Sequence, residues 1–266
     1  MEWWWAYIGL GLFTGFAAGM LGIGGGLIIA PVLTFIYTSQ GNFPPNEILH
    51  MALGTAMATI IFTSASSLRA HHQHQAVIWP LWLKITPGIL LGTLLGTYFA
   101  AQVSSKWLGL IFTGFTCYVA LQLFLNLKPK PSREIPGTAG VIAVGTFIGA
   151  ISALVSVGGA AITVPFLTWC NVRLQHAIGT SAAIGFPIAV GGTLGYIFNG
   201  WEHVGLPPGS IGFVYWPSLL WLVPASMLAA PLGARLTHRL PVESLKRAFA
   251  CLIMAMAVRM LWKLLF

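Results

Sequence analysis

The stretch GIGGGLIIAPVLT at residues 22–34 recurs as SVGGAAITVPFLT at residues 156–168. Each copy is a glycine-rich turn followed by an apolar run that contains a proline and no charge. Six positions are identical at a constant offset of 134 residues, and those in the first copy include Gly24, Gly25, Pro31, Leu33 and Thr34. A block repeated in this way indicates that the chain consists of two related halves.

Two further blocks recur in the same order. LGTA at 53–56 matches IGTS at 178–181, and WPLWLKITPGILLGTLLG at 79–96 matches WPSLLWLVPASMLAAPLG at 216–233. Three ordered matches predict two structural repeats rather than a chance similarity.

A polar, proline-rich segment separates the two halves. It covers residues 127–136, and Pro-rich polar stretches of this kind are typical of connections between structural units. We therefore expect a first transmembrane repeat at 1–126, a cytoplasmic linker at 127–136, and a second transmembrane repeat at 137–266.

The composition indicates a protein that lies largely in lipid. Hydrophobic residues make up 57% of the 266 residues and charged residues 7%, against about 25% charged in soluble proteins. Runs of 44 and 38 residues carry no charge, whereas about 20 apolar residues suffice for one transmembrane helix. These runs lack the alternation of barrel strands. The sequence therefore predicts an all-α, polytopic membrane protein, and basic loops rather than nucleic-acid binding explain the net charge of +8.

Each half is expected to contain five hydrophobic segments, of which the first two form a hairpin broken by glycine. The expected segments are 5–21, 25–38, 48–68, 77–101, 106–126, 137–155, 159–171, 175–198, 211–235 and 242–264. The hairpin either crosses twice or re-enters, and in both cases returns the chain to its starting side. Each half then makes an odd number of crossings, so the two repeats are expected to be inverted, as in many secondary transporters.

Basic residues orient this arrangement in the membrane. With the N-terminus outside, ten Lys and Arg residues lie at the inner face, and the outer face has only Lys106, Arg259 and Lys263. This bias is the one that the positive-inside rule requires. We expect a multi-pass protein of the cell inner membrane with its N-terminus outside.

The glycine turns are candidates for an anion-binding site. Glycine can simply permit a tight turn or close helix packing. Alternatively, the glycines break a helix at membrane depth, and the free N–H groups that start the next helix then attract an anion. The candidate substrate-binding residues in these turns are Gly24, Gly25, Gly26, Gly158 and Gly159.

Hydroxyl residues early in the third segment of each half extend this candidate site. They are Thr55 in the first half, and Thr180 with Ser181 in the second. Such hydroxyls often bond back to the carbonyl four residues earlier. Their recurrence in both halves makes contact with a ligand an equal alternative.

No catalytic or metal-binding set is expected. The chain has no Asp, and its five Glu residues stand at segment edges or in loops, so no carboxylate lies deep in the membrane as a proton relay. His71, His72 and His74 cluster in a basic loop without a carboxylate or thiolate nearby, which favours a solvated loop over a metal site. We expect no enzyme activity, no cofactor and no metal, leaving a small anion and the lipid bilayer as partners.

Together these motifs resemble those of the sulfite exporter TauE/SafE family. The resemblance rests on the glycine-rich tip with its following proline, the later Gly-Thr-Ser, and the basic His loop that leads into Val-x-Trp-Pro. It covers about residues 8–262 and implies a bacterial inner-membrane permease for sulfite, organosulfonates or related sulfur oxyanions. The chain departs from the family pattern at Ala160, where the first tip has Gly26, and at Ile78, where the family often has Asp.

The sequence thus predicts a transporter that exports a small sulfur-containing anion, driven by the membrane potential. An anion channel of the same architecture is one alternative. A non-transporting membrane protein, such as an assembly factor or an intramembrane enzyme, is another, although the missing catalytic set argues against the enzyme.

Overall fold

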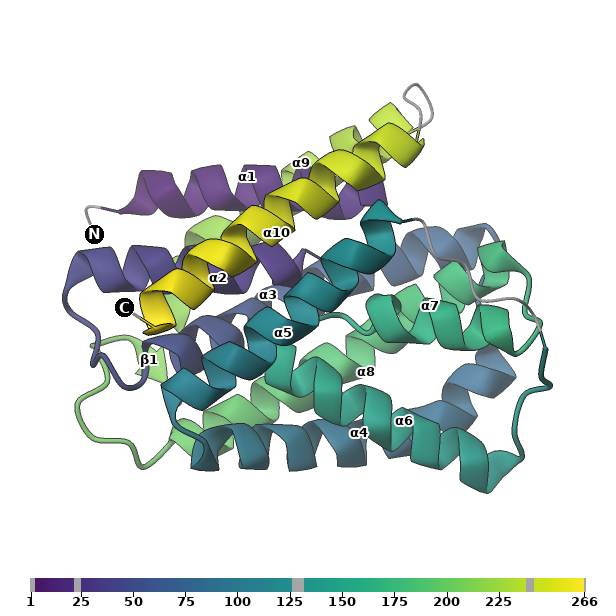
Figure 1. The fold of residues 1–266 in the computed structure, drawn as a ribbon, viewed down its shortest axis with the longest axis horizontal. Coiled ribbons are helices and arrows are strands. Elements are labelled where there is room, and N and C mark those ends of the chain that lie inside the picture. The colour runs from purple at the N-terminus through teal and green to yellow at the C-terminus, as the bar shows by residue number, and fades with distance from the viewer. Residues whose placement is uncertain (1–2, 22–24, 126–131, 238–241, 266) are drawn as a thin grey trace.

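The computed structural model describes residues 3–21, 25–125, 132–237 and 242–265. These residues form ten helices and one short antiparallel β-hairpin (Figure 1). The elements are α1 Trp4–Leu21, α2 Gly26–Gln40, α3 Ile48–Gln73, α4 Trp79–Gln102, α5 Ser105–Phe124, α6 Thr138–Val155, α7 Ala160–Trp169, α8 Leu174–Gly200, β1 Ser210–Ile211, β2 Val214–Tyr215, α9 Trp216–Thr237 and α10 Val242–Leu265. The predicted all-α fold class is confirmed.

Five of the described helices, α3, α4, α5, α6 and α8, are long and apolar enough to cross a membrane. The second arm of each glycine-broken hairpin is shorter. Helix α7 has 10 residues, or about 15 Å at 1.5 Å per residue, which is half of the roughly 30 Å hydrocarbon core. The 15 residues of α2 reach about 22 Å by the same rise. Neither of these two short helices is long enough to span the hydrocarbon core alone.

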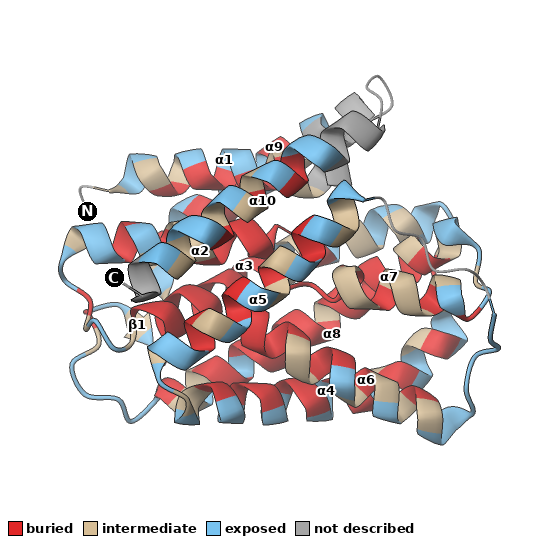
Figure 2. Cartoon of the chain, viewed as in Figure 1, coloured by how far each residue is buried: buried red, intermediate tan, exposed pale blue. Residues whose placement is uncertain are grey.

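Helices α3 and α8 form the centre of the bundle and pack side by side (Figure 2). More than two thirds of their most apolar stretches are buried, against less than half for α4, α5 and α6. The surrounding helices pair across the two halves: α1 packs along α9, α4 along α6, and α5 along α10.

Glycines allow the paired helices to approach at backbone distance. A Cβ on Gly11 of α1 would lie 2.5 Å from the carbonyl oxygen of Leu222 in α9, and one on Gly145 of α6 would lie 2.7 Å from that of Ile85 in α4. These two contacts involve equivalent positions of the sequence repeat, at offsets of 134 and 137. A row of glycines on α4 packs against α6 in the same way, and it consists of Gly88, Gly92 and Gly96.

The equivalent helices of the two halves start at opposite ends of the molecule. Helix α1 begins at the end that carries both termini and the β-hairpin, whereas α6 begins at the other end (Figure 1). The hairpin α1–α2 and the hairpin α6–α7 therefore approach each other head on. Their glycine turns lie between the two ends of the bundle.

Candidate substrate site

Each short helix begins immediately after a glycine in the left-handed conformation. Gly25, with φ 69°, precedes α2, and Gly159, with φ 77°, precedes α7. Side chains with a Cβ rarely adopt this conformation, so both turns require glycine. Both residues are buried. The two halves thus place the same irregular backbone inside the protein, as membrane burial demands.

The turn before α7 has two backbone donors without an acceptor among the described residues. The N–H groups of Ile162 and Thr163 donate to the Gly159 carbonyl at 3.1 and 2.8 Å. The N–H groups of Ala160 and Ala161 have no acceptor in the described part of the chain. Buried N–H groups are nearly always paired, and the start of a helix attracts negative charge. These two donors can therefore receive an anion.

Helix α2 starts in the same way and contacts the glycine turn that precedes α7. We call the turn at Gly25 and Gly26 the first tip, and the turn at 156–159 the second tip. The N–H groups of Ile28 and Ile29 donate to the Gly25 carbonyl at 3.0 and 3.1 Å. Gly26 lies so close to the Ser156 carbonyl oxygen that any Cβ there would overlap it. The structure therefore brings the two predicted tips together. Gly24 lies outside the described residues.

The two predicted threonines instead bind backbone of the opposite half. The Thr55 hydroxyl accepts a hydrogen bond from the Tyr215 N–H at 3.0 Å, and the Thr180 hydroxyl accepts one from the Ile78 N–H at 3.0 Å. Each donor directly precedes the Trp-Pro that begins α9 or α4. Both threonines are fully buried. Each threonine therefore ties its central helix to the start of a helix from the other repeat.

Replacing either threonine by valine should destabilise the fold measurably. Valine has the same shape but leaves the Tyr215 or Ile78 N–H without its acceptor, which costs about 1–3 kcal/mol. We expect Thr55→Val and Thr180→Val each to lower the thermal unfolding temperature of the detergent-solubilised protein, and Thr55→Ser to restore it. Unchanged melting of both valine variants would show that these hydrogen bonds contribute nothing.

Ser181, the last residue of the predicted set, has a different environment. Its side chain is fully buried on α8, and its hydroxyl oxygen has no hydrogen-bond partner among the described residues. A buried hydroxyl without a partner is destabilising unless a ligand or water satisfies it. Of the three predicted hydroxyl residues, Ser181 is therefore the one best suited to bind substrate.

Aromatic residues cover the site toward the end that carries the termini. The Tyr37 ring stacks on Phe43 at 4.2 Å between centroids, and Tyr215 meets both rings edge on. The Tyr37 and Ser218 hydroxyls share a hydrogen bond of 2.8 Å. Burial raises the pKa of the Tyr215 phenol. This cluster therefore carries no charge and forms a packed layer between the tips and that end.

His50 contacts the end of α4 and the start of its own helix. His50 is buried near the start of α3, where its ring nitrogens face the Ala100 carbonyl at 3.0 Å and the Glu47 carboxylate at 3.3 Å. This contact ties α3 to the end of α4. In the part of the chain that the structure describes, no group of three or more His, Cys, Asp or Glu side chains could hold a metal ion.

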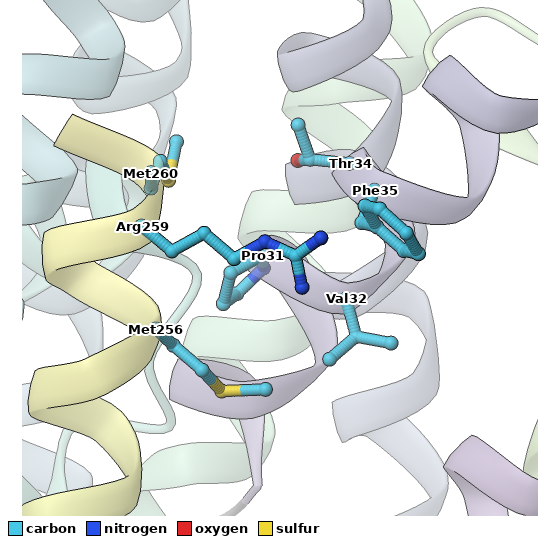
Figure 3. Close-up of a pocket in the computed structure, with 7 residues that line it drawn as sticks. All are labelled: Pro31, Val32, Thr34, Phe35, Met256, Arg259 and Met260. Carbon is cyan, nitrogen blue, oxygen red and sulfur yellow. The ribbon is translucent and has the colours of Figure 1, made fainter. Parts of the chain in front are cut away.

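Two cavities lie on the outer faces of the short helices. The first, of about 110 Å³, lies between α2 and α10 and is lined by Pro31, Val32, Thr34, Phe35, Met256, Arg259 and Met260 (Figure 3). Its Arg259 guanidinium extends over the Phe35 ring, 4.4 Å from the centroid. The second, of about 630 Å³, lies between α6 and α7 and is lined by Ala143, Val144, Phe147, Ile148, Ile162, Pro165, Phe166 and Trp169. Neither lining includes a tip glycine, and both surfaces suit lipid chains.

A multi-pass helical bundle with buried, glycine-broken hairpins defines a membrane transporter, since irregular backbone at this depth marks transport sites. Comparison with known proteins gives the family. The chain belongs to the sulfite exporter TauE/SafE family, whose model matches residues 7–260. This confirms the resemblance seen in the motifs.

Relatives of similar length support this membership. The chain is 32% identical to a probable membrane transporter protein of Haemophilus influenzae over 96% of both chains. It is 24% identical to the probable membrane transporter protein YunE of Bacillus subtilis over 97% of both chains. A probable membrane transporter protein of Methanocaldococcus jannaschii is 24% identical over 95% of this chain and 93% of its own length. No solved structure matches the chain.

The structure also shows a candidate residue that the sequence patterns did not single out. Thr163, in the first turn of α7, is fully buried, and its hydroxyl oxygen has no partner within the described chain. The only sequence signal was the repeat alignment, which pairs Thr163 with the aliphatic Ile29 at the offset of 134.

Proposed function

We propose that this protein exports a small sulfur-containing oxyanion, such as sulfite or an organosulfonate, across the bacterial inner membrane. The observation that carries the proposal is the pair of meeting tips, each a left-handed glycine that opens a short helix. Free N–H groups at a helix start bind an anion without a fixed cation. An anion held in this way can also be released, which transport requires.

The burial of the tips favours a carrier over a channel. Gly25, Gly26 and Gly159 are all buried, and the aromatic layer around Tyr37 packs on one side of them. An anion can reach the tips only if packed helices separate. The two threonine hydrogen bonds, Thr55 to Tyr215 and Thr180 to Ile78, join different helix pairs, α3 with α9 and α8 with α4. One hydrogen bond can therefore break while the other stays intact.

The helix directions support two inverted repeats with the N-terminus outside. Helices α1 and α6 start at opposite ends of the bundle (Figure 1), and the reciprocal pairs α1–α9 and α6–α4 are those that a two-fold axis in the membrane plane generates. Arg173 directly precedes α8, and the Arg133 N–H donates to the carbonyl of Trp169, the last residue of α7. This is the end of the bundle opposite the termini (Figure 1). That end is then the cytoplasmic one.

Cysteine labelling tests this orientation. Val204 and Glu134 are exposed in loops at the two ends of the bundle, and the native cysteines to be replaced first are Cys117, Cys170 and Cys251. In intact cells, a membrane-impermeant maleimide should label Val204→Cys, whereas Glu134→Cys should react only after permeabilisation. The reverse pattern would overturn the orientation, and labelling of both from outside would overturn the inverted repeat.

Flux into proteoliposomes tests the function itself. Labelled sulfite, sulfoacetate, thiosulfate and sulfate are offered separately to vesicles with the purified protein and to protein-free vesicles. We expect saturable uptake of at least one sulfur oxyanion, since a carrier has a finite number of sites. Linear, unsaturable flux would favour the channel, and uptake no faster than in empty vesicles for all four anions would reject the proposal.

A further inference from the structure

Buried hydroxyls without a partner gather in the second half of the protein. Among the described residues, four buried Ser and Thr side chains have no hydrogen-bond partner, namely Thr113, Ser152, Thr163 and Ser181. Three of them belong to α6, α7 and α8, the helices that form and contact the second tip. Such groups are rare in native proteins and call for a specific explanation.

Ordinary helix geometry does not explain these hydroxyls. A helical threonine usually bonds back to the carbonyl four residues earlier, and many here do so, including Thr14, Thr97, Thr116 and Thr193. Thr163 makes no such bond, although it follows Gly159 by four residues in the same turn. Its hydroxyl is therefore free to bind a partner outside its own helix.

Helix geometry places Thr163 and Ser181 at the same level on the neighbouring helices α7 and α8. Gly185 of α8 packs against the Gly158 carbonyl, and a Cβ on Gly159 would lie 3.6 Å from the Thr163 hydroxyl oxygen. Only residues 170–173 connect α7 to α8, so these neighbours run antiparallel. Thr163 follows Gly159 by four residues, and Ser181 precedes Gly185 by four, so the two residues of each pair share a helix face. Because the helices run in opposite directions, Thr163 is then level with Ser181.

The first half has no oxygen at the equivalent positions. The repeat offsets pair Thr163 with Ile29, and Ser181 with Ala56. Ser152 likewise corresponds to Ala18. The backbone turns are therefore duplicated, whereas the hydroxyl donors are not.

We propose that the anion is held asymmetrically, by the second tip alone, with the Thr163 and Ser181 hydroxyls and the N–H groups of Ala160 and Ala161 as its donors. This inference rests on the proposed function and names the donors of its site. Four neutral donors on two helices fit a ligand with several acceptor oxygens on one centre, which is the chemistry of sulfite and sulfonates. The first tip, through Gly26, supports the second tip by close contact.

Binding measurements on variants test the asymmetry. Affinities for sulfite and for methanesulfonate are measured by calorimetry on the protein in nanodiscs. Thr163→Val and Ser181→Ala should each weaken binding about tenfold or more, equivalent to about 1.4 kcal/mol or more, and Thr163→Ser should restore it. Ile29→Val changes the position of the first repeat that is equivalent to Thr163, and Thr116→Val removes a hydroxyl that bonds within α5. Both variants should bind the anions as the unmodified protein does.

Stability measurements separate a binding role from a structural one. Because neither hydroxyl has a hydrogen-bond partner among the described residues, Thr163→Val and Ser181→Ala should melt no lower than the unmodified protein without anion, and should lose the stabilisation that added anion gives. A lower melting temperature without anion would overturn the inference.

The outcomes also distinguish this inference from the proposed function. If Gly26→Ala abolishes binding while Thr163→Val and Ser181→Ala bind normally, the tip site stands and the hydroxyl donors are wrong. If the unmodified protein binds and moves neither anion, both the function and the inference fall.

Discussion

Replacing Gly26 by alanine should lower anion flux about 100-fold, since a displacement of about 1 Å in a preorganised site can cost that much. The added methyl group would overlap the Ser156 carbonyl oxygen and would lie 2.8 Å from the Ile60 side chain. A carbonyl cannot move aside as the end of a side chain can. The two tips must then separate, which displaces the N–H groups that we propose bind the anion.

Two control substitutions make this prediction specific. Gly114→Ala on α5 places its methyl group in open space and should leave flux unchanged. Gly25→Ala meets nothing closer than 3.4 Å but forces a residue with a Cβ into a positive φ of 69°, which costs about 1 kcal/mol. Its flux should therefore fall less than that of Gly26→Ala.

The measurement is initial flux per folded, membrane-inserted protein in proteoliposomes. Normal flux through Gly26→Ala would reject the tips as the site. If Gly26→Ala and Gly25→Ala both fail to give folded protein, the alternative that these glycines serve only helix packing is favoured.

Export should follow the membrane voltage rather than a proton gradient. One charge that crosses 100 mV gains about 2.3 kcal/mol, so a divalent anion leaving an inside-negative cell gains about 4.6 kcal/mol. At about 1.4 kcal/mol for each factor of ten, this supports a gradient of about 2000-fold. The donors at the tips are neutral, and no Asp or Glu side chain stands among the described residues that form them.

Voltage and pH can be set independently in proteoliposomes. Potassium with valinomycin clamps the voltage, and internal and external buffers set the pH gradient. We expect flux of the anion to change with voltage at equal pH on both sides. Flux that followed the pH gradient and ignored voltage would overturn uncoupled export. His50, which contacts Glu47 at 3.3 Å, would then be the first candidate for a proton carrier, with His50→Gln as the variant to measure.

Much of the fold was predictable because its signals are local. Hydropathy located ten segments, and the helices begin and end within a few residues of the expected positions apart from α3 and α9, which differ by five at one end. Glycine marks the turns because Gly25 and Gly159 need a positive φ, and the Pro after each Trp marks the starts of α4 and α9, since proline is favoured in the first helical turn. The hairpin of β1 and β2 was not predicted, because two-residue strands leave no hydrophobic alternation to detect.

The candidate site was predictable only in part, because its chemistry depends on residues distant in sequence. The repeat selected the glycine turns and the positions of Thr55 and Thr180. Only the tertiary structure revealed that Thr55 contacts Tyr215, 160 residues away, and that Thr180 contacts Ile78, 102 residues away. A hydroxyl has the same sequence signature whether it binds the backbone or faces a ligand.

The difference between Ala160 in the second tip and Gly26 in the first shows what the sequence determines and what the tertiary structure determines. The sequence alone established two glycine turns and one alanine in place of a third glycine. The tertiary structure gives the reason that Gly26 cannot change in the same way, because Gly26 faces the Ser156 carbonyl of the opposite tip. Local backbone conformation is set by neighbouring residues and can be predicted from them. The close approach of two tips more than 100 residues apart is set by how the helices pack.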